Sequence, residues 1–320
     1  MTRSGRMQVV DLPAIEKALA GLDLLPLIES GFEAYSAGRT NVPPIGELLM
    51  DKGEVHIKYG CITGDPYYVI KIASGFPDNP ARGLAPGNGL MLLCSQDTGE
   101  IVAVLHDQAH LTDVRTAVAG AIAAKYLAPR AVTRIGILGT GVQARLQLSY
   151  LACVTACRDA LIWGRNPERL SDYVRDMAGS GFDIETTTDT DEIVARCNLI
   201  VTTTAAEAPL LEAGQIRAGT HISAIGSDTP DKQELDTSIL ARADLVVADS
   251  VQQCQARGEI YKALAAGSIS NARLIEIGDV IGGRAQGRTD DSQITVFDST
   301  GVAVQDMMIS RAVFEALGSD

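Results

Sequence analysis

The chain has few aromatic side chains and fewer basic than acidic ones. Aromatic residues make up 4% of its 320 residues, too few for the stacking platforms that bind single-stranded nucleic acids. The 40 acidic side chains outnumber the 27 basic ones and give a net charge of −13, so phosphate backbones and anionic membranes are repelled overall. We therefore expect no nucleic-acid partner, although a local basic pocket for a small anion is compatible with this charge.

Long hydrophobic runs and paired cysteines are also missing. No apolar run approaches the roughly 18 residues of a membrane-spanning helix, and the N-terminus has no apolar stretch of signal-peptide length. The six cysteines include no Cys-x-x-Cys pair, which indicates reduced thiols. His106 and His110 have helical spacing, but no glutamate or cysteine completes a metal set with them. We expect a cytoplasmic protein with no membrane segment and no bound metal.

The pattern of apolar segments predicts two domains. From residue 132 onward, apolar segments alternate with helical stretches, which is typical of a parallel sheet. The expected strands are residues 135–138, 160–163, 199–203, 221–225 and 245–247. We predict an α/β fold with a Rossmann dinucleotide-binding domain (residues 130–297). The rest (residues 1–129 and 298–320) should form a second, α+β domain for substrate binding and dimerisation.

Helix signals flank and punctuate this region. Thr112 and Asp113 are expected to open a helix rich in small residues that Pro129 stops. Asn166 followed by Pro167 is a typical helix start, with a capping residue before a proline at the first helical position. A final helix is expected at residues 305–317, as part of the α+β domain.

The strongest single motif is a glycine-rich turn between the strand at 135–138 and the helix that follows. Its sequence is G-x-G-x-x-A. Gly139 permits the tight turn, Gly141 lets backbone amides approach a pyrophosphate, and Ala144 keeps the helix close to the strand. This context predicts a nicotinamide dinucleotide, NAD(H) or NADP(H), held by residues Gly139, Thr140, Gly141, Val142 and Gln143.

The end of the next strand bears on the choice between these two cofactors. Rossmann domains usually place an acid here to bind the ribose 2′-hydroxyl, but the sequence has Gly164 and Arg165 instead. The Arg165 guanidinium could hold a 2′-phosphate through two hydrogen bonds. It could equally be a solvated side chain in a turn.

Five segments together resemble the ornithine cyclodeaminase/mu-crystallin family. They are residues 71–79 (KIASGFPDN), 111–117 (LTDVRTA), the glycine-rich turn, 223–228 (SAIGSD) with 232–236 (KQELD), and 295–301 (TVFDSTG) with Gln305-Asp306. Their order matters, because five motifs in sequence are far more specific than any one alone. Residues 41–44, 53–55 and 258–259 also resemble the ectoine-utilisation branch of this family.

The resemblance implies roles for three charged residues. Lys71 would face the reacting carbon and bind the substrate carboxylate or polarise an imine or carbonyl. Arg115 would hold the α-carboxylate through two hydrogen bonds. Asp228 would be the catalytic aspartate that activates water or moves the amine proton.

The resemblance further implies dinucleotide contacts and an assembly. Several residues outside the glycine-rich turn are expected to contact the cofactor, and the chain is expected to form a homodimer through its α+β domain. The expected cofactor contacts are Arg115, Thr116, Arg165, Thr202, Thr203, Thr204, Ser227, Asp298 and Ser299.

Two departures from the family pattern bear on the substrate. Gly46 stands near a position where the family often has an arginine, and Lys58 lies in the segment where an acid would receive the distal amine of ornithine. A cation is a poor host for a diamino acid. Lys58 therefore predicts a substrate with a neutral or acidic side chain.

The predicted activity is hydride transfer at the α-carbon of a small amino acid, keto acid or imine by an NAD(P)-dependent dehydrogenase or imine reductase. The first alternative is a cyclodeaminase that oxidises its substrate, releases ammonia and uses the same cofactor again for the reduction. The second is a mu-crystallin-like, non-enzymatic protein that binds NADP. Presence of Lys71, Arg115 and Asp228 together argues against the second alternative, because a pure binding protein has no need of them.

Overall fold

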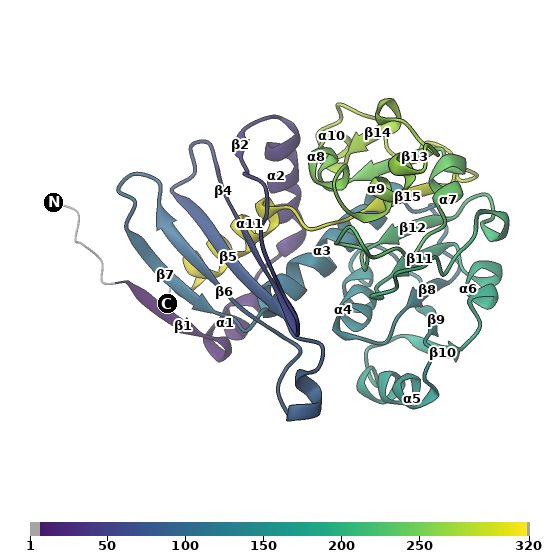
Figure 1. The fold of residues 1–320 in the computed structure, drawn as a ribbon, viewed down its shortest axis with the longest axis horizontal. Helices are drawn as coiled ribbons and strands as arrows, with labels where there is room; N and C mark the ends of the chain where they lie inside the picture. Colours follow the sequence, from purple (N-terminus) through teal and green to yellow (C-terminus); the bar gives the residue numbers. More distant parts are fainter. Residues whose placement is uncertain (1–6, 319–320) are drawn as a thin grey trace. The chain divides into compact units, whose positions relative to one another are not determined.

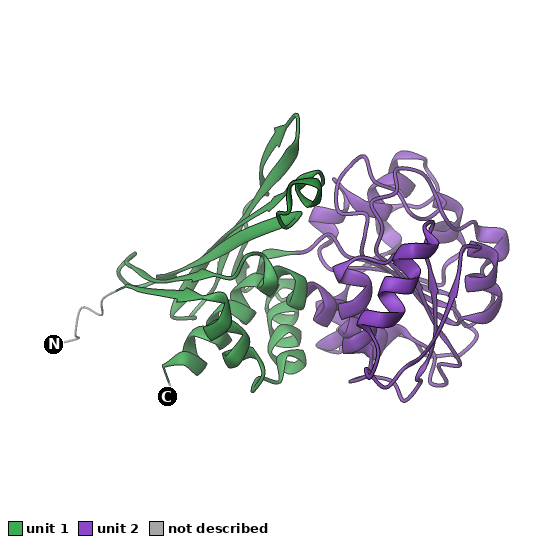
Figure 2. Ribbon diagram, turned by 90° about the horizontal axis from the view of Figure 1, so that it is seen from below, with its two compact units in different colours: residues 1–115, 302–320 green, residues 116–301 purple. Residues whose placement is uncertain are grey.

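The computed structural model describes residues 7–318 and divides into two compact units. Unit 1 comprises Met1–Arg115 and Val302–Asp320, and unit 2 comprises Thr116–Gly301 (Figure 2). The division falls inside helix α3 (His110–Leu127), whereas the sequence suggested a boundary just after it. Pro129 marks the end of this helix, and the change of unit comes earlier, within its first turns.

Unit 1 is built on a seven-stranded sheet in the order β1-β7-β6-β5-β4-β2, with β3 also paired to β4. The β1–β7 pair is parallel and the other pairs are antiparallel. Helices lie on one face of the sheet (Figure 2). The elements of this unit are β1 (Gln8–Asp11), α1 (Leu12–Leu19), α2 (Leu24–Ser36), β2 (Thr40–Asn41), β3 (Gly46–Met50), β4 (Gly53–Ile62), β5 (Tyr67–Gly75), a 3₁₀ turn (Asn79–Arg82), β6 (Gly87–Ser95), β7 (Ile101–His106) and α11 (Ala303–Leu317).

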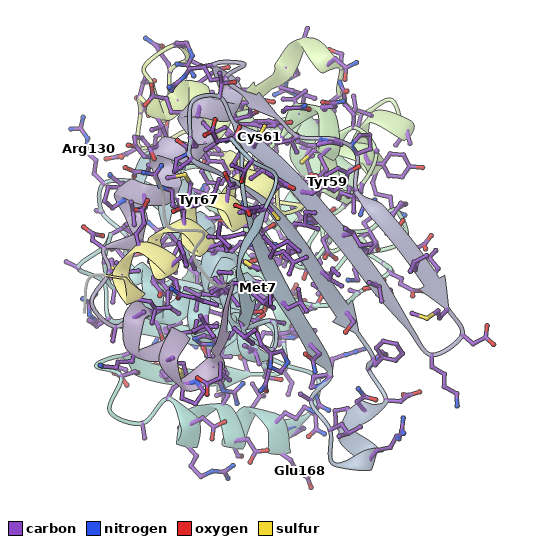
Figure 3. The ribbon with its side chains drawn as sticks, turned by 90° about the vertical axis from the view of Figure 1, so that its left-hand side faces the viewer. Met7, Tyr59, Cys61, Tyr67, Arg130 and Glu168 are labelled. Atoms are coloured by element: carbon purple, nitrogen blue, oxygen red, sulfur yellow. The ribbon has the colours of Figure 1, made fainter. Side chains whose placement is uncertain are left out.

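The C-terminal helix α11 forms the core of unit 1. It contacts α1, α2 and strands β4, β5 and β6, and residues 303–310 are all buried. A helix buried on every side is typical of a protein interior. Tyr67, at the start of β5, packs edge-to-face on Phe314 of α11, with ring centroids 5.5 Å apart. Figure 3 labels Tyr67 on β5 and Tyr59 and Cys61 on the neighbouring strand β4.

Unit 2 is a Rossmann domain, which confirms the predicted fold class. Its eight strands are all parallel, in the order β10-β9-β8-β11-β12-β15-β13-β14, with helices packed around them (Figure 1). Every residue of β8, β11, β12 and β15 is buried, as expected for strands covered on both faces. The strands are β8 (Ile135–Leu138), β9 (Asp159–Trp163), β10 (Asp183–Thr187), β11 (Leu199–Thr202), β12 (His221–Ala224), β13 (Leu245–Ala248), β14 (Leu274–Glu276) and β15 (Thr295–Asp298).

The helices of unit 2 are short and connect these strands. The sequence did not predict β10 or β14, because both are edge strands and neither has an apolar run. The remaining elements are α4 (Val142–Leu151), α5 (Pro167–Asp176), α6 (Thr190–Arg196), α7 (Thr237–Arg242), α8 (Val251–Cys254), α9 (Gly258–Ala265), α10 (Ile277–Ile281) and two 3₁₀ turns (Ala213–Gln215 and Asn271–Arg273).

Two helix starts can be compared with the sequence signals. Helix α5 begins at Pro167, and the Asn166 side chain caps it by accepting a hydrogen bond from Glu168 N at 2.8 Å. Helix α3 begins at His110, two residues before the expected Thr112. Asp107 Oδ2 accepts from Leu111 N at 2.8 Å, so an aspartate further upstream satisfies the first turn.

Within residues 7–318, no helix is long and apolar enough to cross a membrane.

Candidate functional site

The glycine-rich turn in unit 2 has the shape expected of a phosphate-binding loop. It joins β8 to α4 at the point where the strand order reverses between β8 and β11, the usual ligand position in such sheets. Gly139 has φ +126°, and a Cβ there would collide with Thr203. A Cβ on Gly141 would have no heavy atom within 4 Å, so the space in front of the turn is open. The backbone therefore leaves room for a group that approaches the amides directly.

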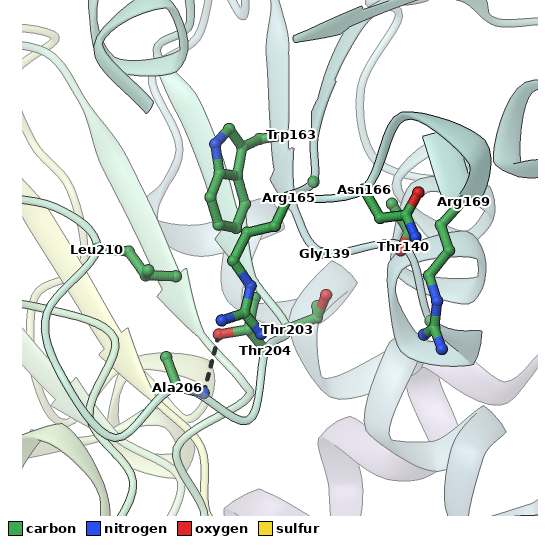
Figure 4. Close-up of a pocket in the computed structure, with 12 residues that line it drawn as sticks. Gly139, Thr140, Trp163, Arg165, Asn166, Arg169, Thr203, Thr204, Ala206 and Leu210 are labelled. Atoms are coloured by element: carbon green, nitrogen blue, oxygen red, sulfur yellow. Dashed lines mark hydrogen bonds between the residues drawn. The ribbon is translucent and has the colours of Figure 1, made fainter. Parts of the chain in front are cut away.

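A pocket of about 400 Å³ opens beside this turn (Figure 4). It includes six of the predicted dinucleotide contacts and no aspartate or glutamate. Its volume, its glycine edge and its position at the strand ends fit a dinucleotide. The lining residues are Gly139, Thr140, Gly141, Trp163, Gly164, Arg165, Asn166, Arg169, Thr203, Thr204, Ala206 and Leu210.

The other predicted dinucleotide contacts do not line this pocket. Val142 and Gln143 form the first turn of α4, and Val142 is exposed. Thr116 lies in α3, and its carbonyl accepts a hydrogen bond from Gln147 at 3.1 Å. Thr202, Ser227, Asp298 and Ser299 are buried. Their contact with a cofactor stays a prediction.

Behind the pocket, the buried carboxylate of Glu234 ties together two of the strand-end loops. Glu234 Oε1 accepts from the backbone N–H and the hydroxyl of Thr204, at 2.6 and 2.8 Å. Glu234 Oε2 accepts from Thr202 Oγ1 at 2.6 Å and Gly226 N at 3.0 Å. Each oxygen thus receives one backbone N–H and one hydroxyl. Since Thr204 lines the pocket, Glu234 fixes part of its wall.

Three further buried acids, Glu259, Asp249 and Asp298, extend this arrangement. Glu259 accepts the backbone N–H of Glu234 at 2.6 Å and that of Leu235 at 3.3 Å. Asp249 Oδ2 accepts from Ser299 Oγ at 3.0 Å and Gly301 N at 2.6 Å. Asp298 Oδ2 accepts from Ile260 N at 2.8 Å. We call Glu234, Glu259, Asp249 and Asp298 the carboxylate network.

Burial sets the acidity of the network. It raises the pKa of Glu259 to about 7, with the neighbouring charge of Glu234 acting in the same direction. Burial also raises the pKa of Glu234, against the hydrogen bonds donated by Thr202, Thr204 and Gly226. The pKa of Asp298 is raised by burial and by the charges of Glu259 and Asp249. Glu234, Glu259 and Asp298 therefore hold protons more tightly than free carboxyl groups do.

Unit 1 contains a buried group of opposite sign, which we call the cation cluster: Lys58, Lys71 and Arg115 around Asp306. Lys58 and Lys71 are register partners on β4 and β5, so their side chains lie next to each other on one face of the sheet. Lys71 Nζ lies 3.3 Å from Asp306 Oδ2 in an ion pair whose geometry does not make a hydrogen bond. All four residues are at least nine-tenths buried.

Arg115 is held on one side only. Its Nε donates to Asp306 Oδ1 at 3.0 Å and its Nη1 to Gln305 Oε1 at 2.7 Å. These are the two side-chain hydrogen bonds of Arg115 in the described structure, and neither uses Nη2. The buried Gln305 Nε2 has no partner among the described residues. Buried donors without partners are uncommon in native proteins. The cluster therefore presents donors without partners beside three buried basic side chains.

Electrostatics within the cluster favour a negatively charged ligand. Burial lowers the pKa of Lys71 well below its ordinary value, against the attraction of Asp306 and together with repulsion from Arg115 and Lys58. For Asp306 burial acts to raise the pKa, but Arg115, Lys71 and Lys58 outweigh it and hold the pKa below its ordinary value. Asp306 thus stays ionised, with three buried basic side chains beside it.

Asp228, the third predicted catalytic residue, lies in unit 2 in the loop after β12. Its carboxylate is partly exposed and pairs with Lys232 Nζ at 2.7 Å. The structure thus brings Lys58, Lys71 and Arg115 together within one unit and places Asp228 at the strand ends of the other. Within residues 7–318, no group of histidine, cysteine and acidic side chains could hold a metal ion.

Sequence reasoning missed several residues of these sites. Gln305 and Asp306 were noticed only as part of a family motif, although an acid in the first turn of a helix is a signal in itself. Arg169 was also overlooked, although it stands one helical turn after Arg165. The roles of Glu234 and Glu259 depend on tertiary contacts that no local pattern reveals.

Comparison with known proteins agrees with the fold and with the motifs. The model of the ornithine cyclodeaminase/mu-crystallin family matches residues 7–320. The chain belongs to this family. An uncharacterized cyclodeaminase of Sinorhizobium fredii is 42% identical over 299 residues, 92% of this chain and 90% of that protein. The iminosuccinate reductase of Paracoccus denitrificans is 33% identical over 313 residues, 95% of this chain and 96% of the reductase.

Solved structures of the family show the same architecture. An archaeal alanine dehydrogenase dimer with bound NAD superposes with a TM-score of 0.90 at 33% identity, covering 98% of this chain and 96% of the dehydrogenase. Members of the ornithine cyclodeaminase/mu-crystallin family therefore include dehydrogenases, imine reductases and cyclodeaminases, and these relatives are enzymes.

Proposed function

We propose that this chain is an NAD(P)-dependent oxidoreductase that acts at the C–N bond of a small amino acid or the corresponding imine. The cation cluster is the observation that carries this proposal. Its three buried cations around one carboxylate, with the unpartnered donors of Arg115 and Gln305, suit the carboxylate of an amino or imino acid. The open glycine-rich turn of unit 2 suits the dinucleotide.

In this proposal each residue has a separate task. A bound nicotinamide dinucleotide supplies or accepts the hydride. Arg115 holds the α-carboxylate through the edge of its guanidinium that Asp306 and Gln305 leave available, which orients the α-carbon. Lys71 polarises the reacting centre, and its lowered pKa makes it able to give up a proton near neutral pH more readily than an ordinary lysine.

Asp228 is proposed to exchange a proton with water or with the amine. Asp228→Asn keeps the shape of the side chain but removes this capacity, so turnover should fall about 10²–10⁴-fold. Asp231→Asn, an exposed acid three residues along the same loop, is the matched control and should leave turnover unchanged. Near-normal turnover by the Asp228 variant would remove this aspartate from the mechanism.

Substrate choice is proposed to follow from Lys58. A third buried cation beside Lys71 favours a neutral or acidic side chain and disfavours the distal amine of a diamino acid. The similarity to an iminosuccinate reductase is in line with this.

The test is a cofactor-linked screen. Keto acids with ammonia or methylamine would be offered with the reduced cofactor, and amino acids with the oxidised cofactor. We expect a stoichiometric change in the absorbance of the reduced nicotinamide with neutral or acidic substrates. The second candidate is a cyclodeaminase, favoured by the 42% identity to a protein of that description. Efficient conversion of ornithine to proline without net cofactor change would establish that candidate instead, and binding without any turnover would indicate a non-enzymatic binding protein.

The homodimer also remains a proposal. Leu48, Leu49 and Met50 of β3 expose large apolar surfaces, and exposed strands of this kind need to be covered. Sedimentation at micromolar concentration should give a dimer.

A further inference from the structure

Two arginines line the pocket beside the glycine-rich turn without any charged partner. Arg165 follows the end of β9, and Arg169 lies one turn into α5 (Figure 4). Both are exposed, and neither forms an ion pair or hydrogen bond with a residue in the described range 7–318. Glu168, which stands between them in sequence, does not line the pocket. Two free guanidinium groups thus face a space that contains no acid.

Nearby arginines of the same unit do have charged partners, unlike Arg165 and Arg169. Arg145 pairs with Asp176 at 2.7 Å, and Arg175, on the same helix as Arg169, pairs with Asp172 at 2.7 Å. Other arginines of unit 2 without an ion pair donate to backbone carbonyls, as Arg158 and Arg242 do. Arg165 and Arg169 instead stay available for a ligand.

The local backbone fixes where these two side chains start. Asn166 caps α5 through its hydrogen bond with Glu168 N, so Arg165 lies just before the helix and Arg169 lies in its first turn. This ten-residue helix adds the positive end of its dipole to the same place. Trp163 also lines the pocket, and its buried indole N–H has no hydrogen-bond partner in the described structure.

We propose that Arg165 and Arg169 form a subsite for the 2′-phosphate of NADP(H) and make the chain prefer NADP(H) to NAD(H). The subsite rests on the dinucleotide site proposed above. A ribose phosphate is a compact anion that two guanidinium groups can hold with several charge-assisted hydrogen bonds. A site selective for NAD uses a carboxylate on the ribose hydroxyls instead, and this pocket has none.

The subsite can be tested by binding alone, without substrate. Isothermal titration calorimetry would compare adenosine 2′,5′-bisphosphate with adenosine 5′-monophosphate, which differ only in the 2′-phosphate. The wild-type chain should bind the bisphosphate at least about 10-fold more tightly, the effect of one hydrogen bond to a charged group. The affinity for NADPH should exceed the affinity for NADH by a similar factor. Both affinities can be measured from the fluorescence of Trp163, which lines the pocket and is the single tryptophan of the chain.

Three variants locate the effect. Arg165→Ala and Arg169→Ala should each weaken bisphosphate binding about 10- to 150-fold and change monophosphate binding less than about twofold. Arg175→Ala removes the same charge from the same helix outside the pocket and should change neither. An Arg165→Asp variant should lose the bisphosphate but still bind NADH.

Each adverse result has its own meaning. Equal binding of the two adenosine nucleotides by the wild type would overturn the subsite and leave the proposed function standing. The subsite would also be overturned if the arginine variants lost affinity for both adenosine nucleotides equally, because the arginines would then bind the adenine or the 5′-phosphate. A wild type that binds neither NADH nor NADPH would overturn the proposed function as well.

Discussion

The two units bury charge in opposite ways. In the carboxylate network of unit 2, Glu234 accepts four hydrogen bonds from the chain's own loops. In the cation cluster of unit 1, Lys71 and Arg115 share the single carboxylate of Asp306, and donors of Arg115 and Gln305 have no partner among the described residues. Buried charge is costly unless it is paired and hydrogen-bonded.

This difference separates a scaffold from a binding site. Glu234 is satisfied internally, so its charge serves to hold loops in place. The cation cluster is incomplete, because the buried Gln305 Nε2 and one terminal nitrogen of Arg115 have no hydrogen-bond partner among the described residues. An anionic substrate would supply the missing acceptors. Changes in the cation cluster should therefore affect catalysis, whereas changes in the carboxylate network should affect stability and the dinucleotide pocket.

The largest effect is expected from Lys71→Met, which removes one charge of the cation cluster and keeps the length of the side chain. The kcat/KM for the best substrate should fall about 10²–10⁴-fold. The dissociation constant of the dinucleotide should change less than about twofold, because the glycine-rich turn is in unit 2. Lys52→Met, which removes an exposed charge from the β3–β4 turn, is the control. A Lys71 variant that loses dinucleotide binding and turnover equally would contradict the division of tasks.

The carboxylate network should make the stability of unit 2 depend on pH. Glu259 has its pKa raised from 4.5 to about 7 in the folded state, so the folded state holds this proton more tightly than the unfolded chain. The stability that protonated Glu259 contributes is complete below pH 4.5 and is lost as the pH rises through 7. The unfolding free energy should fall by up to about 3 kcal/mol across this window. Glu234 and Asp298 act in the same direction, and the Cys254 thiol also faces the network through Asp249.

Urea unfolding followed by Trp163 fluorescence measures this dependence, because Trp163 is the chain's single tryptophan and is buried in unit 2. Glu259→Gln should reduce the slope against pH, whatever its effect on absolute stability. Glu207→Gln, at an exposed position of the same unit, should keep the wild-type slope. Identical slopes for the wild type and the Glu259 variant would show that this carboxyl does not carry the effect.

A smaller effect is expected from Glu234→Gln. Each carboxylate oxygen accepts one backbone N–H, from Thr204 or from Gly226. A glutamine amide must therefore point its own N–H₂ group at one of these donors in either orientation, which should cost about 1–3 kcal/mol. Thr204 lines the pocket, so dinucleotide affinity should fall too.

Calorimetry and urea unfolding of the Glu234→Gln variant measure both effects. Thr202→Val removes a single hydroxyl donor and leaves both backbone donors satisfied. This variant should therefore lose less unfolding free energy than Glu234→Gln. If Thr202→Val destabilised the chain more than Glu234→Gln, the carboxylate would not be the element that holds these loops.

The same comparison explains how far the sequence could lead. The glycine-rich turn and the apolar strands of unit 2 are local patterns, and they predicted the Rossmann fold and the pocket residues Gly139, Thr140, Gly141 and Arg165. The pocket residues Thr203 and Thr204 were implied only by the family resemblance. Asp306 could not be paired with Arg115 from the sequence, because 191 residues separate them. The adjacency of Lys58 and Lys71 depends on the register of β4 against β5, and a slip by one residue would place them on opposite faces.

The smallest expected effect, and the finest test of the cation cluster, concerns Lys58. Lys58→Met removes the cation beside Lys71 but keeps Lys71, Arg115 and Asp306. The preference for an acidic over a neutral substrate, taken as the ratio of their kcat/KM values, should fall about 10-fold, the effect of one charge-assisted contact. Because the charge of Lys58 helps to lower the pKa of Lys71, its removal should also shift the alkaline limb of the kcat/KM profile to higher pH. Loss of turnover on both substrates with an unmoved alkaline limb would mean that Lys58 only supports the sheet.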